Sequence, residues 1–291
     1  MPELSVILVS FNDWVHLEKC LQSLRVSPPE LDLEIIVVDN NSSDGSPDLV
    51  KKKFPEVKLF CNNENLGFSK ANNLGIRVST GEFVLFLNND TIVNIQALTV
   101  LLDEMKRNPS AGATGPALLS DQEIYQVSFG KKVDFFSEFI QKGFFNFYYS
   151  KKLKSDQQVR EVGWLSAACL LVRRIALEET GFFDENYFLY FEDIDLCYQI
   201  RQKGWALCFC PQAQITHIGG TSTSTVKNSS RYHYRKSQIY FYRKHNSRLS
   251  LGLLKIYLWI NITIFFLHNQ GRNEEPFGRK KYMQLLGKQD Q

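Results

Sequence analysis

The amino-acid sequence predicts an α/β fold in which helices cover both faces of a mostly parallel sheet. Short apolar runs, such as those at 4–11 and 83–87, are typical of strands that are buried on both sides. Segments with apolar residues at helical spacing, such as 95–107, separate these runs. The runs end in polar residues, at the edge where the strands of an open α/β sheet bind ligands.

Strands and helices are expected to alternate through the first 115 residues. Leu17, Leu21 and Leu24 recur at helical spacing, and Ser46 followed by Pro47 predicts a helix start, with the Ser46 hydroxyl as the cap and Pro47 at the first helical position. Such alternation indicates right-handed crossovers between parallel strands. The strands are expected at residues 4–11, 33–38, 57–61 and 81–90, with helices between them and a further helix at 95–107.

The pattern changes after about Gly115. The segment Phe129–Lys154 is rich in aromatic residues and lysines, which fits either a helical hairpin with an aromatic core or a surface-binding segment. Buried strands are expected again at 163–174 and 206–218, with a helix at 192–203 between them. A basic aromatic helix then leads from Ser229 into a mostly apolar run at 249–267.

Composition and cysteine usage indicate a globular protein of a reducing compartment. The chain has 291 residues, of which 44% are hydrophobic and 22% charged, and both values are ordinary for a globular protein. Its six cysteines include no Cys-x-x-Cys pair, and Cys208 and Cys210 alternate along an expected strand. The first residues lack a basic region and a cleavage site, so we interpret them as a strand and not as a signal peptide.

Positive charge is concentrated towards the C-terminal end of the chain. Residues 226–291 contain 13 Lys/Arg and 3 Asp/Glu, a balance of +10, whereas the preceding residues contain 21 and 28, a balance of −7. This asymmetry indicates that the basic region meets an anionic partner, either nucleic acid or a membrane surface. No recognisable nucleic-acid motif accompanies the charge, so no nucleic-acid partner is expected.

Two common nucleotide-binding motifs are absent from the sequence. No Gly-x-Gly-x-x-Gly follows the first strand, and no Gly-x-x-x-x-Gly-Lys-Ser/Thr occurs. Polar residues at the expected strand ends remain as candidates for chemistry. A carboxylate there could hold a divalent cation against a phosphorylated ligand, but the run Asn88-Asn89-Asp90-Thr91 could equally cap the next helix.

Several short motifs, in the expected order, resemble the inverting nucleotide-sugar glycosyltransferases of family 2. They are Val-Val-Asp-Asn-Asn-Ser-Ser-Asp-Gly-Ser at 37–46, Asn-Leu-Gly-Phe-Ser-Lys-Ala-Asn-Asn at 65–73, Leu-Asn-Asn-Asp at 87–90 and Phe-Glu-Asp at 191–193. The run His-Ile-Gly-Gly-Thr-Ser at 217–222 is similar to the rhamnosyltransferase-like branch. The resemblance covers roughly residues 3–225 and implies a GT-A fold, with a Rossmann-like, mostly parallel sheet and a C-terminal helical extension.

This resemblance also implies a division of the chain. Residues 1–115 would form the nucleotide-sugar-binding half, and residues 116–225 the acceptor-binding and catalytic half. Residues 226–291 would form a basic, partly apolar helical region.

Roles for individual residues follow from the same resemblance. Asp90 and His217 would hold Mg²⁺ or Mn²⁺, although His217 could instead be an ordinary hydrogen-bonded strand residue. Asn88 stands where the family has the first Asp of its Asp-x-Asp motif, so the affinity for metal is expected to be lower. The residues expected to bind the donor nucleotide are Phe11, Asp39, Lys70, Asn88 and Asn89.

The expected reaction is a single displacement that inverts the anomeric centre. Asp193 matches the catalytic base that would deprotonate the acceptor hydroxyl. Glu192 and Trp164 are assigned to the acceptor side, although Glu192 and Asp193 could instead be first-turn acids favoured by the helix dipole. The alternative to an enzyme is a non-catalytic module of the same fold that binds nucleotide or glycan, since Asn88 lacks the charge of an Asp.

The implied partners are a nucleotide-sugar donor and a glycan or lipid-linked acceptor, with rhamnose from a dTDP donor as the candidate sugar. The run Leu249–Leu267 is near the lower length limit of a spanning helix and is interrupted by Lys255, Asn261 and Thr263; a central Lys or Asn is costly inside hydrocarbon. We therefore expect a cytoplasmic enzyme, peripheral at the inner face of the plasma membrane and bound to anionic lipid. Alternatively, the run packs on the catalytic domain or forms the face of a homodimer.

Overall fold

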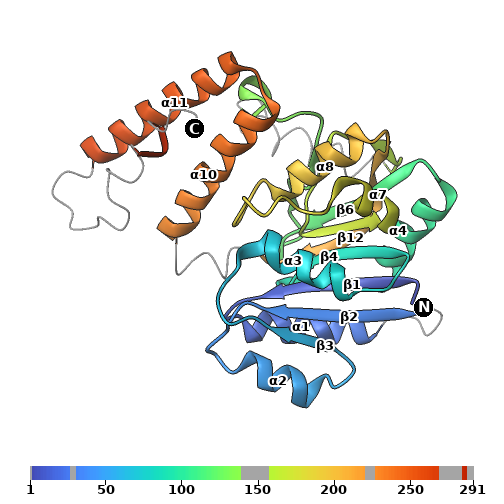
Figure 1. Cartoon of the computed structure of the whole chain (residues 1–291). Coiled ribbons are helices and arrows are strands. Elements are labelled where there is room, and N and C mark those ends of the chain that lie inside the picture. The colour runs from blue at the N-terminus through green and yellow to red at the C-terminus, as the bar shows by residue number, and fades with distance from the viewer. Residues whose placement is uncertain (1, 27–30, 139–156, 220–226, 269–283, 287–291) are drawn as a thin grey trace.

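The computed structural model describes residues 2–26, 31–138, 157–219, 227–268 and 284–286. One twisted sheet organises them, in the order β3-β2-β1-β4-β11-β6-β12-β5, with β7 paired to β6 and β9 to β12 (Figure 1). Its strands are β1 (Leu4–Ser10), β2 (Leu33–Asp39), β3 (Lys58–Cys61), β4 (Phe83–Asn88), β5 (Thr91–Ile92), β6 (Ala111–Leu119), β7 (Tyr125–Gln126), β9 (Arg160–Glu161), β11 (Cys169–Arg173) and β12 (Ala206–His217).

The pairing confirms the predicted mostly parallel α/β fold. Strands β1 to β4 run parallel to one another, and β12 runs parallel to β6. Strand β11 is antiparallel to both of its neighbours, β4 and β6, and thereby joins the two parallel groups. The sheet therefore combines strands from residues 1–115 and from residues 116–225.

Helices cover both faces of this sheet, as the continuous apolar strands require. One apolar layer packs α1, α2 and α4 against the sheet, and the other packs α3, α7 and α8 against it. The helices are α1 (Trp14–Arg25), α2 (Ser46–Lys53), α3 (Gly67–Val78), α4 (Ile95–Arg107), α7 (Arg174–Thr180), α8 (Glu192–Gln202), α10 (Lys227–His245) and α11 (Arg248–His268).

Two local predictions differ from the structure. Ser46 is the first residue of α2 and not its cap, because Gly45 takes the cap position with a φ of 83°. The strand expected at 163–174 is broken into β10 (Trp164–Leu165) and β11. It breaks because β10 leaves the main sheet to pair with β8 (Phe129–Gly130), so residues 166–168 turn between the two sheets.

The C-terminal part of the chain forms two neighbouring helices, α10 and α11. They lie beyond the carboxyl ends of the parallel strands (Figure 1). Helix α10 contributes Phe241 and Tyr242 to the apolar layer of α8, and α11 contributes Leu254 and Leu258. Within the described residues, no helix is both long and apolar enough to cross a bilayer. Much of the aromatic, lysine-rich segment Phe129–Lys154 lies outside the described residues.

Candidate active site

A cavity of about 370 Å³ lies at the carboxyl ends of the parallel strands. This is the edge at which an open α/β sheet binds ligands. Five residues predicted from the sequence line it, namely Phe11, Asn88, Asn89, Asp90 and His217. The other lining residues are Val9, Asn40, Asn65, Gly67, Phe68, Phe188, Leu189, Tyr190, Ser229, Ser230 and His233.

Asp90 and His217 meet because β5 pairs with the end of β12. In this antiparallel pair Thr91 lies opposite His217, and the backbone N–H of Ile218 donates to the carbonyl oxygen of Asp90 at 3.0 Å. Nε2 of His217 consequently lies 3.3 Å from Oδ1 of Asp90. The residue that caps α4 is Asn94, so the polar run at 88–91 is not a helix cap.

The ring of His217 is held by Gln126 of β7. Nε2 of Gln126 donates to the carbonyl oxygen of His217 at 2.8 Å, so Oε1 of Gln126 is the acceptor that lies 2.7 Å from Nδ1 of His217. Nδ1 must then carry the proton, and in neutral His217 the lone pair of Nε2 points towards Asp90 and Asn88. An outer hydrogen bond of this kind is how proteins fix the tautomer of a metal-binding histidine.

The residues at this point suit a divalent cation. Oδ1 of Asp90 is buried and accepts no hydrogen bond from the described residues, and it faces the lone pair of Nε2. Burial favours a raised pKa for Asp90, but the imidazolium form of His217 outweighs burial and holds the pKa below its ordinary value; in the neutral form of His217 a cation would take the place of the Nε2 proton. The described part of the chain holds no cluster of three or more His, Cys, Asp and Glu side chains suited to a metal. Asp90 and His217 would therefore provide part of a shell that donor oxygens and water complete.

The predicted donor residues at β2 and α3 are placed beside the cavity and do not line it. Asp39 ends β2, is 2% exposed, and accepts a hydrogen bond from the backbone N–H of Ser42 at 2.8 Å. Its neighbour Asn40 lines the cavity and donates to the carbonyl oxygen of Gly67 at 3.1 Å. Lys70 lies on α3 with an exposed side chain.

Glu192 and Asp193 occupy the first turn of α8, as the sequence predicts. The carboxylate of Asp193 accepts two backbone hydrogen bonds, from Ala167 at 3.1 Å and from Ile194 at 2.8 Å. Burial nevertheless raises the pKa of Asp193 above its ordinary value. The pKa of Glu192 is also raised, because the side chain is buried and stands beside the charge of Asp193. A carboxylate whose pKa is shifted towards neutrality is a more effective general base.

The turn between β10 and β11 joins the two groups of polar residues. The backbone N–H of Asn88 donates to the carbonyl oxygen of Ala168 at 3.0 Å, and the next residue back, Ala167, donates to Asp193. Trp164 lies just before this turn in β10, against which α8 packs. Trp164 is 7% exposed, and its Nε1, like Oε2 of Glu192, has no hydrogen-bond partner within the described ranges.

Sequence reasoning missed Gln126 and the wall that α10 contributes to the cavity. Gln126 stands in an ordinary polar stretch and follows no motif that singles it out. Ser229, Ser230 and His233 belong to a segment that we interpreted as a basic tail, and only its aromatic content distinguished it from a solvated helix.

Comparison with known proteins places the chain in a family. The family model described as "Glycosyl transferase family 2" matches residues 5–181. An N-acetylglucosaminyl-diphospho-decaprenol L-rhamnosyltransferase from Mycobacterium tuberculosis (strain ATCC 25618 / H37Rv) is 30% identical over 264 residues, covering 84% of this chain and 85% of that protein. Rhamnosyltransferase WbbL from Escherichia coli (strain K12) is 24% identical over 251 residues, covering 82% of this chain and 92% of that protein.

Solved structures share the fold at lower sequence identity. The mannosyltransferase PcManGT from Pyrobaculum calidifontis, in complex with GDP-Man and Mn²⁺, has a TM-score of 0.60 at 19% identity and is matched over 84% of this chain and 65% of its own. GalNAc-T7 with UDP, GalNAc and Mn²⁺ has a TM-score of 0.61 at 17% identity, over 81% of this chain and 47% of its own. The chain therefore belongs to glycosyltransferase family 2 and is a sugar-transferring enzyme with the GT-A fold.

Proposed function

We propose that this enzyme is an inverting, metal-dependent glycosyltransferase that moves rhamnose from a dTDP donor to a lipid-linked sugar. The observation that carries the proposal is the paired Asp90 and His217 in the cavity, joined through residues 167–168 to the carboxylate of Asp193. The rhamnosyltransferase relatives, one of which is named for an N-acetylglucosaminyl-diphospho-decaprenol substrate, support the choice of sugar and acceptor.

The donor would lie in the cavity with its diphosphate towards Asp90 and His217. Mn²⁺ or Mg²⁺ held there would neutralise the charge that develops on the leaving diphosphate. The structures with Mn²⁺ cited above support a divalent ion. Asn88 and Asn89 would donate hydrogen bonds to the donor from the end of β4, and Phe11 would cover it from the loop after β1. Asp39 and Lys70 would hold the nucleotide at the neighbouring strand end.

Asp193 would act as general base. It takes the proton of the acceptor hydroxyl while that oxygen bonds to the anomeric carbon and the bond to the diphosphate breaks. Because one displacement takes place, from the face opposite the leaving group, the anomeric configuration inverts. Glu192 and Trp164 would line the acceptor side, where each has a buried polar atom without a partner in the described part of the chain.

Calorimetric binding of dTDP, UDP and GDP, each with and without Mn²⁺, tests the donor site. We expect dTDP to bind with Mn²⁺, and Asp90→Ala to abolish the dependence on Mn²⁺. Asp103→Ala, a change to an exposed side chain of α4, is the matched control. Release of dTDP from dTDP-rhamnose in the presence of a polyprenyl diphosphate-linked GlcNAc then tests turnover. Binding without turnover would indicate a non-catalytic module, and metal-dependent binding retained by Asp90→Ala would disprove the metal site.

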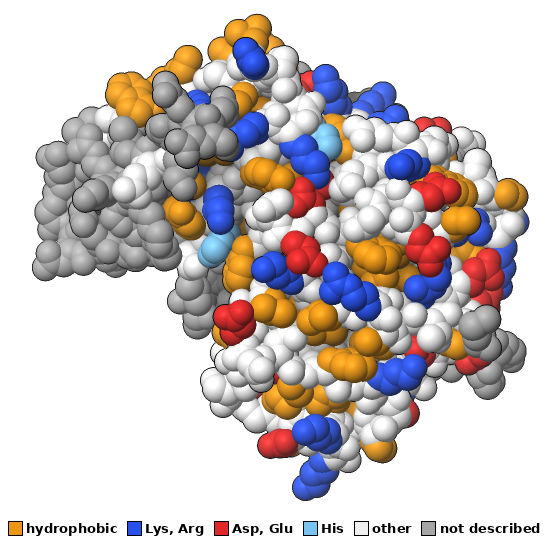
Figure 2. All heavy atoms as spheres, in the orientation of Figure 1, with side chains coloured by type: hydrophobic (Ala, Val, Ile, Leu, Met, Phe, Trp, Pro, Cys, Tyr) orange, Lys and Arg blue, Asp and Glu red, His pale blue; other side chains and the backbone are white. Residues whose placement is uncertain are grey.

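We further propose that α11 rests on an anionic membrane surface at the cytoplasmic face. Leu254 and Leu258, each 2% exposed, face the protein, whereas a second apolar stripe faces outward at helical spacing. Figure 2 shows hydrophobic side chains along the outer edge of this helix. A helix with lipid-facing apolar residues and nearby basic residues lies in the membrane interface. The stripe consists of Leu249, Ile256, Trp259, Ile260 and Ile264.

Flotation with phosphatidylglycerol and phosphatidylcholine vesicles tests this contact. We expect the enzyme to float with the anionic vesicles, and the double variant Ile256→Ser/Trp259→Ser to remain in the dense fraction. Ile175→Ser is the control, because Ile175 is also exposed (51%) but lies on α7. Equal flotation of both variants would disprove the proposal. A protein that does not float but forms a dimer sensitive to the double substitution would assign the stripe to a homodimer interface.

A further inference from the structure

The residues just before the two acids of α8 adopt a strained backbone. Tyr190 and Phe191 have φ values of 70° and 68°, and Phe191 is the N-cap of the helix. Residues other than Gly rarely adopt this left-handed backbone conformation. Two such residues in succession persist only where surrounding contacts hold them. The direction in which Glu192 and Asp193 leave the first turn depends on this backbone.

Helix α10 contacts every residue of the segment 187–191, which ends in the two strained residues. The contacts are Tyr187 with Tyr240 (ring centroids 4.9 Å apart), Phe188 with His233 (4.6 Å), the carbonyl oxygen of Leu189 with the hydroxyl of Ser237 (2.8 Å), Tyr190 with Tyr234 (5.6 Å) and Phe191 with Tyr234 (5.2 Å) and Phe241 (5.5 Å).

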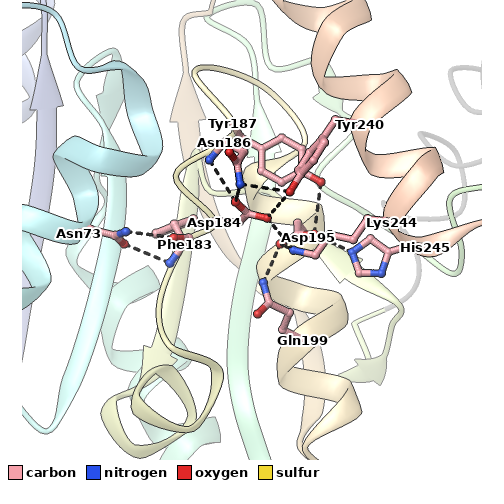
Figure 3. A network of polar contacts seen from close by, with 10 residues as sticks. All are labelled: Asn73, Phe183, Asp184, Asn186, Tyr187, Asp195, Gln199, Tyr240, Lys244 and His245. Atoms are coloured by element: carbon pink, nitrogen blue, oxygen red, sulfur yellow. Dashed lines mark hydrogen bonds and ion pairs between the residues drawn. The ribbon is translucent and has the colours of Figure 1, made fainter. Parts of the chain in front are cut away.

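In the first turn of α8, a buried ionic network secures the same helix (Figure 3). Asp195 is fully buried, and its two carboxylate oxygens lie 2.9 Å from Nζ of Lys244 and 2.6 Å from Nε2 of His245. Lys244 also reaches Asp184 at 2.8 Å, and Tyr187 donates to Asp195 at 3.2 Å. The C-terminal end of α10 is therefore held to α8 by groups whose separation would leave a buried charge without its partners.

We infer that α10 is a positioning element of the active site, which holds the 187–191 segment so that Asp193 faces the reacting centre. The inference rests on the proposed role of Asp193. The family match ends at residue 181, so the 187–191 segment and α10, which begins at Lys227, both lie beyond the matched region. The same helix closes one wall of the cavity with Ser229, Ser230 and His233.

Loosening α10 would let Tyr190 and Phe191 return to ordinary backbone angles. That relaxation would rotate the first turn of α8 and displace the carboxylate of Asp193, while Asp90 and His217 at the ends of β4 and β12 would stay in place. Because Phe188, Leu189 and Tyr190 also line the cavity, the expected consequence is a fall in kcat that is larger than any change in the Kd for nucleotide and metal. A displacement of about 1 Å at a reacting group lowers the rate by about a hundredfold.

Two substitutions weaken the contacts between α10 and residues 187–191, and two others serve as controls. Ser237→Ala removes the hydrogen bond to Leu189, and Tyr234→Leu removes two ring contacts. Tyr234→Phe keeps the ring and should behave like the parent. Tyr242→Phe removes a hydrogen bond of 2.9 Å to Glu138, so it weakens another contact of α10 and leaves the contacts with residues 187–191 intact.

Hydrogen exchange measured by mass spectrometry gives a readout that needs no substrate. Ser237→Ala and Tyr234→Leu should speed exchange in peptides covering 187–195 by about threefold or more, and Tyr242→Phe should not. In the transfer assay the first two variants should lose kcat by about tenfold to a hundredfold, and the Kd for dTDP and Mn²⁺ should change far less than kcat.

Exchange in 187–195 that is unchanged in both loosening variants would overturn the inference, as would an equal change in Tyr242→Phe. Faster exchange with an unchanged kcat would also overturn it, because the position of Asp193 would then not depend on the contacts between α10 and residues 187–191. A parent enzyme that shows no turnover with dTDP-rhamnose would contradict the proposed function instead, and the exchange experiment would still decide whether α10 holds the segment.

Discussion

Replacing Asp193 by Asn separates the chemistry of this carboxylate from its structural role. The side chains have the same shape, but an amide cannot take a proton from the acceptor hydroxyl. Loss of a positioned general base lowers the rate by about 10² to 10⁴. We therefore expect Asp193→Asn to bind donor nucleotide normally and to lose turnover by that factor, which equals about 2.7–5.4 kcal/mol of transition-state stabilisation.

The effect of the same substitution on stability can be worked out from the contacts. Each carboxylate oxygen of Asp193 accepts one backbone hydrogen bond, from Ala167 and from Ile194. An Asn side chain has a single acceptor oxygen, so one of these N–H groups would face an NH₂ group, at a cost of about 1–3 kcal/mol. Removing a buried negative charge beside Glu192 offsets part of this cost. We expect only a modest fall in Tm.

The assay is release of dTDP from dTDP-rhamnose, with the Kd for dTDP and Mn²⁺ measured by calorimetry on the same preparation. Glu192→Gln is the matched comparison, since it removes the neighbouring carboxylate without touching Asp193. A kcat of Asp193→Asn within threefold of the parent would refute the assignment. If Glu192→Gln alone lost activity, the base would have to be Glu192.

Three further predictions concern the metal site, the buried acid pair and the contact between α3 and the loop before α8. Gln126→Ala removes the acceptor for Nδ1 of His217, so calorimetric affinity for Mn²⁺ with dTDP should fall by about 10- to 100-fold. The pKa of Glu192 is raised above the ordinary value of 4.5, so folded protein holds this proton more tightly than unfolded protein does, and the associated stability is lost as pH rises above 4.5. The Tm of Glu192→Gln minus that of the parent should therefore increase as the pH rises from about 5 to about 9. A difference in Tm that does not vary with pH would contradict the raised pKa. Gly67 has a φ of 79°, and a Cβ there would overlap the carbonyl oxygen of Phe188, so Gly67→Ala should lower the free energy of unfolding by at least about 1–3 kcal/mol in urea titrations. An unchanged midpoint would show that the loop can move aside.

Part of the candidate site could be predicted from short-range pattern alone. The apolar run of β4 followed by Asn88-Asn89-Asp90 predicted a buried strand with polar residues at its ligand-binding end, and the structure has both features. The helical spacing at 95–107 predicted α4 with its observed bounds. The motif Phe-Glu-Asp at 191–193 likewise stands at the start of the predicted helix.

Contacts between distant segments escaped this reasoning. Nothing near Gln126 in the sequence indicates that it holds His217, because that contact depends on β7, β6 and β12 lying side by side. The same applies to α10, whose alternation of aromatic and basic residues is equally compatible with a solvated tail. Its contacts with residues 187–191 arise only when the helix folds back on α8.

The sequence by itself determined the alternation of buried strands and helices, the polar end of β4 with Asp90, and the start of α8 with Asp193. It could do so because burial and helical periodicity act over a few neighbouring residues. Tertiary structure alone decided that β5 pairs with β12, which brings Asp90 to His217, and that the turn at 166–168 links Asn88 to Asp193. These contacts depend on which distant strands become neighbours in the sheet, and local periodicity carries no information about that choice.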